Sequence, residues 1–258
     1  MVKSLRKDEL LRHIREPEKI TRLRHVLDLP EISSRNYRAT AGDFLDPYEQ
    51  QLVASWTPHF SEVELSFEPA GDWERKIPIY KPFDTEDNFL SAFYLEGGPF
   101  DHRQILGSLL GMGIERDKIG DIAATDDGAY VFVKKEIANF IAVNFRKVGA
   151  TPIRLKEIPA LSVPEIEEDW NEAAAVVSSM RLDAVVRAVT HKPRDEVKGL
   201  VAKGLVKVNF KRAEKTHDMI APGDMISVRG FGRIKIFEPL YRTKKDKVRF
   251  QYGTLNSR

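Results

Sequence analysis

Residues 181–230 read RLDAVVRAVTHKPRDEVKGLVAKGLVKVNFKRAEKTHDMIAPGDMISVRG. At the start of this stretch, apolar side chains recur at helical spacing and predict an amphipathic helix. Pro193 stands at the first turn of a second predicted helix, which Gly204 ends. Alternating apolar residues over 206–209 and 225–228 predict two strands. The stretch therefore predicts two short helices packed on a small sheet.

Basic side chains in the same stretch fall outside the apolar stripes. Arg194 and Lys198 are four residues apart and share a helix face. Arginine presents a bidentate fork to phosphate and lysine a mobile point charge, so the cluster predicts a phosphate-binding surface whose affinity falls with salt. An internal ion pair of Arg181 or Arg194 with Asp183 is the open alternative for either residue. The predicted RNA-binding residues are Arg181, Arg187, Lys192, Arg194, Lys198, Lys203, Lys207, Asn209, Lys211 and Arg212.

The order and spacing of several short motifs carry a family resemblance. Arg181-Leu182-Asp183, Arg194, the stretch 197–209 and Gly223-Asp224 together resemble the S4-type (αL) RNA-binding domain. The stretch departs from that family at Pro193, where a serine is usual. The resemblance implies RNA contacts at Arg181, Arg194, Lys198 and Lys207.

The charge of the chain is divided unevenly along its length. The formal net charge of its 258 residues is +2, but residues 180–258 hold 19 Lys/Arg against 8 Asp/Glu, whereas residues 1–179 hold 22 against 31. This asymmetry predicts a polyanion-binding C-terminal segment. The absence of cysteine excludes disulfides, thiolate metal sites and a cysteine nucleophile. No window approaches a membrane span and no apolar run follows the charged N-terminus, so we expect a cytoplasmic protein with no membrane partner.

Residues 85–160 predict a second RNA-binding fold. The expected order is strand, helix, strand, strand, helix, strand, which is the ferredoxin-like arrangement of RRM-like domains. Tyr130 and Phe132 lie two residues apart on the third strand and so share one face. The lysine-glycine-aromatic signature of base-stacking sheets is missing, which favours buried packing for both rings. The elements are expected at 89–95, 103–112, 121–124, 130–133, 136–148 and 153–158.

The remaining segments complete an α+β, multi-domain prediction. Residues 1–84 predict an N-terminal α+β domain with helices near 5–14, 20–27 and 47–56 and strands near 63–67 and 77–80, and Pro30 is expected to end the second helix. Residues 161–179 are acidic and predict a linker with a short helix over 170–177. Residues 180–258 predict the S4-type domain with a basic β tail.

The motifs before and after the basic stretch indicate one family of proteins that contain the S4-type domain. The segments 102–107 and 111–122, with Asp43-Phe44-Leu45-Asp46-Pro47 and Arg229-Gly230-Phe231-Gly232-Arg233, resemble the YlmH family. These bacterial proteins carry an N-terminal domain, a central domain assigned to RNA binding and an S4-type domain. The resemblance implies a non-enzymatic factor without cofactor or small-molecule substrate. Its implied partners are structured RNA (rRNA and tRNA) and the large ribosomal subunit with obstructed peptidyl-tRNA, in ribosome-associated quality control.

Two other classes of function are weighed against this one. Arg181-Leu182-Asp183 matches the catalytic triplet of pseudouridine synthases, many of which carry an S4-type domain. In those enzymes the triplet lies downstream of that domain in a separate fold, whereas here it opens the basic stretch. The neighbours His102 and Arg103 could do acid–base work, but no partner carboxylate accompanies them, which favours a helix-start or phosphate role. A protein–protein adaptor that RNA merely localises remains open.

Overall fold

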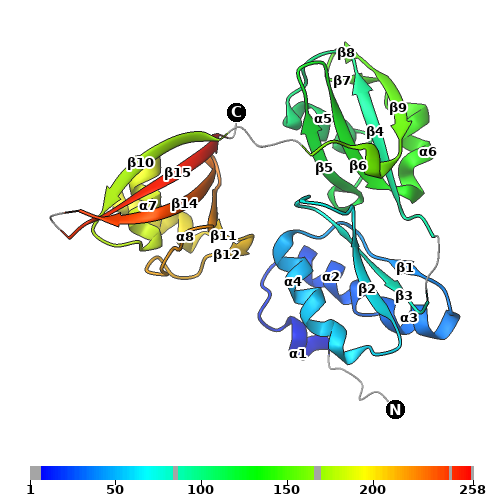
Figure 1. Ribbon diagram of the computed structural model, residues 1–258, viewed down its shortest axis with the longest axis horizontal. Coiled ribbons are helices and arrows are strands. Elements are labelled where there is room, and N and C mark those ends of the chain that lie inside the picture. Colours follow the sequence, from blue (N-terminus) through cyan, green and yellow to red (C-terminus); the bar gives the residue numbers. More distant parts are fainter. Residues whose placement is uncertain (1–6, 84–86, 166–169, 244–245, 257–258) are drawn as a thin grey trace. The chain divides into compact units, whose positions relative to one another are not determined.

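The computed structural model describes residues 7–83, 87–165, 170–243 and 246–256, without the side chains of residues 238–240 and 256. The chain divides into two compact units, residues 1–166 and 167–258, and each is described by itself. Figure 1 labels the helices and strands of both. The structure confirms an α+β chain with several sheets. In the described part of the chain, helices are too short to cross a membrane.

The first part of unit 1 packs four helices with a three-stranded sheet in the order β1-β3-β2. A capping box starts α4: the Asp46 carboxylate accepts the Glu49 backbone N–H at 3.0 Å, and the Glu49 carboxylate accepts that of Asp46 at 2.9 Å. The prediction that Pro30 ends a helical segment is wrong, since Pro30 lies in the first turn of α3, where a missing N–H breaks no hydrogen bond. The elements are α1 (Lys7–Leu11), α2 (Pro17–Val26), α3 (Leu29–Asn36), β1 (Thr40–Ala41), α4 (Pro47–Trp56), a 3₁₀ turn (Thr57–His59), β2 (Glu64–Glu68) and β3 (Ile77–Lys81).

The second part of unit 1 is a four-stranded antiparallel sheet in the order β5-β6-β4-β9. One face packs on α5 and α6, and the other packs on the first part of the unit (Figure 1). A short β7-β8 hairpin precedes the last strand. The elements are β4 (Leu90–Glu96), α5 (His102–Gly111), a 3₁₀ turn (Arg116–Lys118), β5 (Ile119–Ala124), β6 (Gly128–Lys134), α6 (Lys135–Asn144), β7 (Lys147–Val148), β8 (Thr151–Pro152), β9 (Arg154–Ile158) and a 3₁₀ turn (Ala160–Ser162).

The two aromatic residues of β6 face the first part of the unit. Phe132 is 1% exposed, and its ring lies 4.8 Å from that of Trp73 in a cluster with Phe44. Tyr130 is half-buried, with its ring 4.9 Å from the Tyr94 ring. Buried packing is therefore confirmed for Phe132, because the face on which bases would stack is covered.

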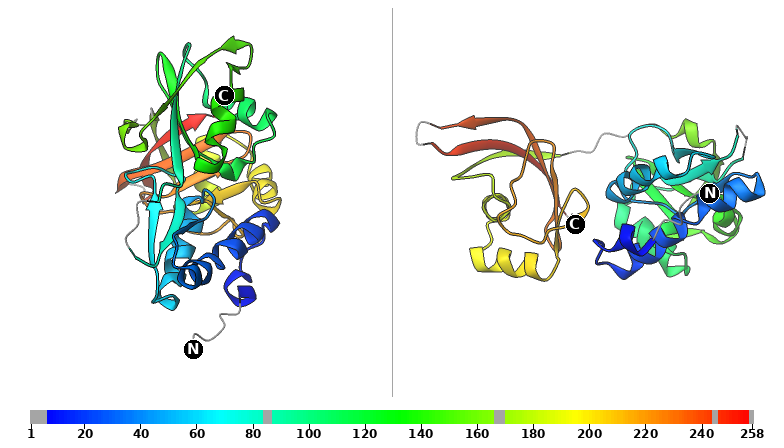
Figure 2. Two further views of the ribbon diagram at one scale, coloured as in Figure 1. Left: turned by 90° about the vertical axis from the view of Figure 1, so that its right-hand side faces the viewer. Right: turned by 90° about the horizontal axis from the view of Figure 1, so that it is seen from below.

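Unit 2 is a six-stranded sheet in the order β10-β15-β14-β13-β11-β12, with α7 and α8 on one side of it (Figure 1). Figure 2 shows the same unit from two further directions. Its core lies between the helices and the sheet and includes Val185, Val197, Ile226, Ile234 and Phe250. The elements are β10 (Asn171–Val177), α7 (Leu182–Thr190), α8 (Arg194–Ala202), β11 (Val206–Val208), β12 (Lys211–Arg212), β13 (Met225–Val228), β14 (Gly232–Arg242) and β15 (Val248–Asn256).

One predicted element has the wrong type. The helix expected over 170–177 is strand β10, which pairs with β15 along its whole length, from Asn171 opposite Thr254 to Val177 opposite Val248. The alanines of this segment favour a helix by local propensity. In the folded chain, the free edge of the β14–β15 hairpin offers the segment a complete set of backbone hydrogen bonds, and it forms a strand. Residues 166–169 of the predicted acidic linker lie outside the described residues, as do residues 84–86 at the first predicted domain boundary.

Candidate nucleic-acid interface

The predicted helices of unit 2 place their basic side chains on the side away from the core. Leu182, Val185, Val186 and Val189 of α7 are all buried, as are Val197 and Val201 of α8. Because one helix face is used in packing, Arg187 and the α8 residues Arg194 and Lys198 are left exposed. The left-handed conformation of Gly204, with φ of 70°, ends α8 as predicted.

A shallow pocket of about 250 Å³ lies at the start of both helices. Three arginines from different positions converge on it: Arg181 precedes α7, Arg187 lies on α7 and Arg194 opens α8. No described carboxylate pairs with Arg187. The lining residues are Ser178, Ser179, Arg181, Asp183, Ala184, Arg187 and Arg194.

The carboxylate of Asp183 is the acidic centre of this pocket, and its side chain is 5% exposed. Arg181 donates to it in bidentate fashion, with Nε to Oδ1 and Nη2 to Oδ2 both at 3.0 Å, and Arg194 Nη2 lies 3.6 Å from Oδ2. Burial acts to raise the pKa of Asp183, but the hydrogen bonds and charge of Arg181 outweigh it, so the pKa lies below its usual value. The internal pairs considered for Arg181 and Arg194 therefore both form.

These ion pairs do not consume the positive charge of the pocket. Three guanidinium groups surround one carboxylate, and the side chains of Arg181 and Arg194 stay 39% and 57% exposed. The bidentate pair also holds the Arg181 guanidinium in a fixed plane. The arrangement is a preorganised cationic surface, which suits phosphate groups.

The other predicted residues are distributed around the module. Lys192 pairs with Glu196, and Lys198 lies 3.6 Å from Asp195, which is 95% exposed. Both pairs lie at the exposed start of α8, with Lys192 just before the helix, and contribute little to stability. Lys203 is exposed after α8, and Lys211 is exposed on β12. The structure does not bring these four lysines into the pocket.

Two of the predicted residues hold the module together. The Asn209 side chain donates to Asp224 Oδ1 at 2.7 Å and accepts the Met225 backbone N–H at 2.8 Å, so its amide closes a turn. Arg212 donates to the Ala202 carbonyl at 3.4 Å and lies opposite Lys207 across β11 and β12.

Sequence reasoning missed the two serines of the pocket. Ser178 and Ser179 link β10 to α7 and bring two hydroxyl groups to the arginines. Two hydroxyl donors separated by one residue from the Arg-Leu-Asp triplet were a usable signal, since serine commonly binds phosphate oxygens. The incorrect prediction of a helix over 170–177 hid this signal, because it assigned the two serines to a linker.

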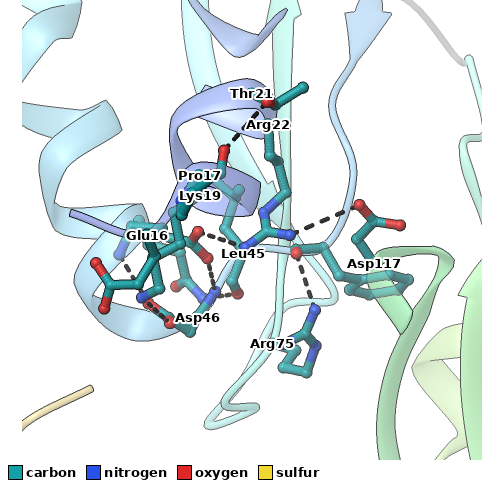
Figure 3. A network of polar contacts seen from close by, with 12 residues as sticks. Glu16, Pro17, Lys19, Thr21, Arg22, Leu45, Asp46, Arg75 and Asp117 are labelled. Atoms are coloured by element: carbon teal, nitrogen blue, oxygen red, sulfur yellow. Dashed lines mark hydrogen bonds and ion pairs between the residues drawn. The ribbon is translucent and has the colours of Figure 1, made fainter. Parts of the chain in front are cut away.

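His102 and Arg103, which invited a chemical interpretation, are exposed at the start of α5. Asp101 caps α5 by accepting the Arg103 backbone N–H at 3.3 Å, so His102 and Arg103 mark a helix start. Elsewhere in unit 1, a largely buried network joins α2 and α4 to the 3₁₀ turn before β5: Arg22 lies 2.6 Å from Glu49 Oε1 and 3.6 Å from Asp117 Oδ2, and Figure 3 shows the contact between Arg22 and Asp117. Pairing offsets the cost of burying these charges, and removal of one partner would leave a buried charge without compensation.

The comparisons with known proteins agree in pointing to one group. A family model described as "Putative RNA-binding domain in YlmH" matches residues 98–162, and the S4 domain model matches residues 180–226. The chain is 33% identical over 255 residues to the ribosome-associated protein quality control protein P2 of Bacillus subtilis (strain 168), covering 95% of this chain and 98% of that protein. Its fold is similar to that of the cell division protein ylmH from Streptococcus pneumoniae, with a TM-score of 0.50, 19% identity, and coverage of 56% of this chain and 93% of that one.

Proposed function

The chain belongs to the YlmH family, and on that premise we propose that it is a non-enzymatic RNA-binding factor of ribosome-associated quality control. We propose as its target the large ribosomal subunit that carries an obstructed peptidyl-tRNA, with contacts to rRNA and to tRNA. Its place of action is then the cytoplasm. The relative from Bacillus subtilis, which matches nearly the whole chain, supports this assignment through its printed name.

The observation that carries the proposal is the convergence of Arg181, Arg187 and Arg194 on one pocket. Phosphate contacts position a protein on folded RNA and need cations in a fixed arrangement. Asp183 supplies that arrangement, because it holds Arg181 at two points and lies beside Arg194. A guanidinium that is already ordered loses less conformational freedom when it binds phosphate.

The same contacts weigh against the pseudouridine-synthase alternative. A catalytic aspartate must reach its substrate, but Asp183 is 4% exposed and both of its carboxylate oxygens are engaged by Arg181. Residues 232–242 and 248–256 form two strands of the S4-bearing sheet instead of a separate catalytic fold. These features support RNA binding without chemistry.

For the central domain we propose the ferredoxin-like fold. The antiparallel strand order β5-β6-β4-β9 and the crossing helices α5 and α6 support it. The sheet face that stacks bases in related modules is covered by Phe44 and Trp73. Any RNA contact of this domain must therefore use its loops or helices.

Sedimentation of the full chain with isolated ribosomal subunits tests the proposed target. We expect co-sedimentation with large subunits, strengthened when these carry peptidyl-tRNA, and little with small subunits. RNA crosslinks mapped on the same particles give the site. Equal binding to both subunits, or crosslinks to ribosomal proteins alone, would contradict the proposal and favour a protein–protein adaptor.

A further inference from the structure

The sheet of unit 2 has a second face, turned away from α7 and α8, which we call the outer sheet face. Side chains alternate along a strand, so the buried residues define which positions point outward. Ile234 and Ile236 of β14 are in the core, which places Arg233, Lys235 and Phe237 on the outer sheet face. On β15, Phe250 is in the core, and this places its exposed neighbours Arg249 and Gln251 outside.

Aromatic rings gather on this face. Trp170 and Phe237 meet edge to face, with ring centroids 6.4 Å apart and planes at 89°. Gly253 makes room for them, because a Cβ at that position would lie 2.7 Å from Trp170 Cβ and 2.8 Å from Phe237 Cζ. Farther along the hairpin, Tyr241 is 53% exposed and lies opposite Arg249.

Three cations lie near aromatic rings of this unit. Lys235 Nζ is 5.8 Å from the centre of the Trp170 ring, and the Arg233 guanidinium is 5.8 Å from that of Phe210. Arg249 is exposed beside Tyr241. Among the described side chains of β10, β13, β14 and β15, the register puts one carboxylate, Glu172, on this face. The outer sheet face is thus basic and aromatic together.

We propose that the outer sheet face is a second RNA-binding surface, which binds single-stranded RNA separately from the Arg181–Arg187–Arg194 pocket. Bases stack on Trp170, Phe237 and Tyr241, and phosphates pair with Lys235 and Arg249. Interleaved rings and cations fit unpaired nucleotides, because each base offers a π face and each nucleotide a phosphate. An acidic protein would use the cations but gain little from the rings, and a duplex keeps its bases stacked internally.

The proposal is tested on the full chain with a labelled twelve-nucleotide oligouridine and, in parallel, with a labelled RNA hairpin. Lys235→Glu with Arg249→Glu is expected to weaken oligouridine binding about tenfold or more, and hairpin binding much less. Arg194→Glu with Lys198→Glu, in the helices, is expected to do the reverse. Arg35→Glu with Arg38→Glu makes the same charge change at exposed positions in the first part of unit 1, outside the central domain, and is the matched control.

A stacking contribution is tested by Phe237→Leu, which keeps apolar packing against Trp170 but removes the ring. A loss of oligouridine affinity of about fivefold is expected. Oligonucleotides with 5-iodouridine should crosslink at Trp170, Phe237 or Tyr241. Circular dichroism and the melting temperature verify folding, and Lys235→Gln with Arg249→Gln replaces the reversal if that variant unfolds.

Three results would overturn the proposal. The first is unchanged oligouridine affinity in the folded Lys235 and Arg249 variants. The second is crosslinks confined to α7 and α8, which would assign all RNA to the pocket. The third is competition by polyglutamate as strong as that by unlabelled oligouridine, which would indicate an acidic protein partner. Binding of the RNA hairpin reports on the pocket. If the outer sheet face proves not to bind oligouridine, the hairpin measurements still test the proposed function of the pocket on their own.

Discussion

Charge reversal on α8 is the sharpest test of the basic surface at the pocket, through the double variant Arg194→Glu with Lys198→Glu, since Arg194 lines the pocket and Lys198 lies outside it one helical turn farther along α8. Both side chains are more than half exposed, at 57% and 51%, and each lies 3.6 Å from its carboxylate partner. The Lys198–Asp195 pair is exposed on both sides, and such a pair contributes about 0–1 kcal/mol. Asp183 is buried, but it keeps its bidentate pair with Arg181 in the variant, so we expect the variant to fold, which its melting temperature verifies. Its effect should therefore fall on RNA binding.

The size of that effect follows from the exposure of the two side chains. In water, a unit charge about 4 Å from a phosphate is stabilised by about 1 kcal/mol, and reversal replaces this attraction with a similar repulsion. Two reversals thus cost about 4 kcal/mol before screening, and salt near physiological strength reduces this to about 2 kcal/mol. The expected loss of affinity is about thirtyfold.

The salt dependence supplies an independent readout of the same contacts. If about four to six phosphates are neutralised, log affinity should fall against log salt with a slope of roughly three to five. Losing two contacts should lower that slope by about 1.8. Binding of the full chain to large subunits, measured by sedimentation from low to high salt, gives both quantities.

Arg35→Glu with Arg38→Glu serves as the control, because it changes the net charge equally at exposed positions in the first part of unit 1, outside the central domain. It should bind like the natural chain apart from a small nonspecific loss. The reasoning is refuted if the α8 variant binds normally, if the control loses as much, or if the complex is insensitive to salt.

Three further predictions concern unit 1 and are checked by urea unfolding of the full chain. Glu49→Gln should lower the free energy of unfolding by about 3 kcal/mol, because it leaves the largely buried Arg22 guanidinium without its carboxylate at 2.6 Å. An unchanged urea midpoint would show that the pair makes no net contribution to stability. Burial and a neighbouring carboxylate raise the pKa of Asp121 to about 6, so the folded state binds the proton more tightly than the unfolded state. Stability should therefore fall as pH rises from about 4 to about 6, and Asp121→Asn should abolish that dependence, whereas a persisting slope would assign it to another group. Gly120→Ala should lower the free energy of unfolding by about 1–3 kcal/mol, since the added Cβ would lie 2.6 Å from the Phe44 ring. Unchanged stability would mean that the ring moves aside.

The sequence predicts much of unit 2 because the decisive signals are local. The helical spacing of Leu182, Val185, Val186 and Val189, and the glycine at 204, define α7 and α8 without knowledge of the rest of the chain. The strand at 171–177 could not be found in this way. Its hydrogen-bond partner, β15, begins at Val248, and an alanine-rich segment carries no sign of a distant edge.

The same division applies to the predicted interface. Local charge density marks the module as basic and includes Arg181, Arg187 and Arg194 among ten predicted RNA-binding residues, but it does not separate these three from the rest. Sequence could not decide whether Asp183 neutralises them or orders them, and it assigned Asn209 to RNA although the folded chain uses its amide to close a turn. The outer sheet face was not anticipated, since its residues come from 170, 233–241 and 249–251.

By itself, then, the sequence determined the helix faces, the turns, the uneven distribution of charge and the membership in a family of RNA-binding proteins. The helix faces and the turns depend on neighbours within a few residues, whereas the charge distribution and the family membership come from comparing whole segments of the sequence. Only the tertiary structure decided which cations converge on one pocket, which carboxylate orders them and which aromatic rings are buried. Those outcomes depend on strand pairing and packing between residues far apart in sequence, and local patterns do not encode such distances.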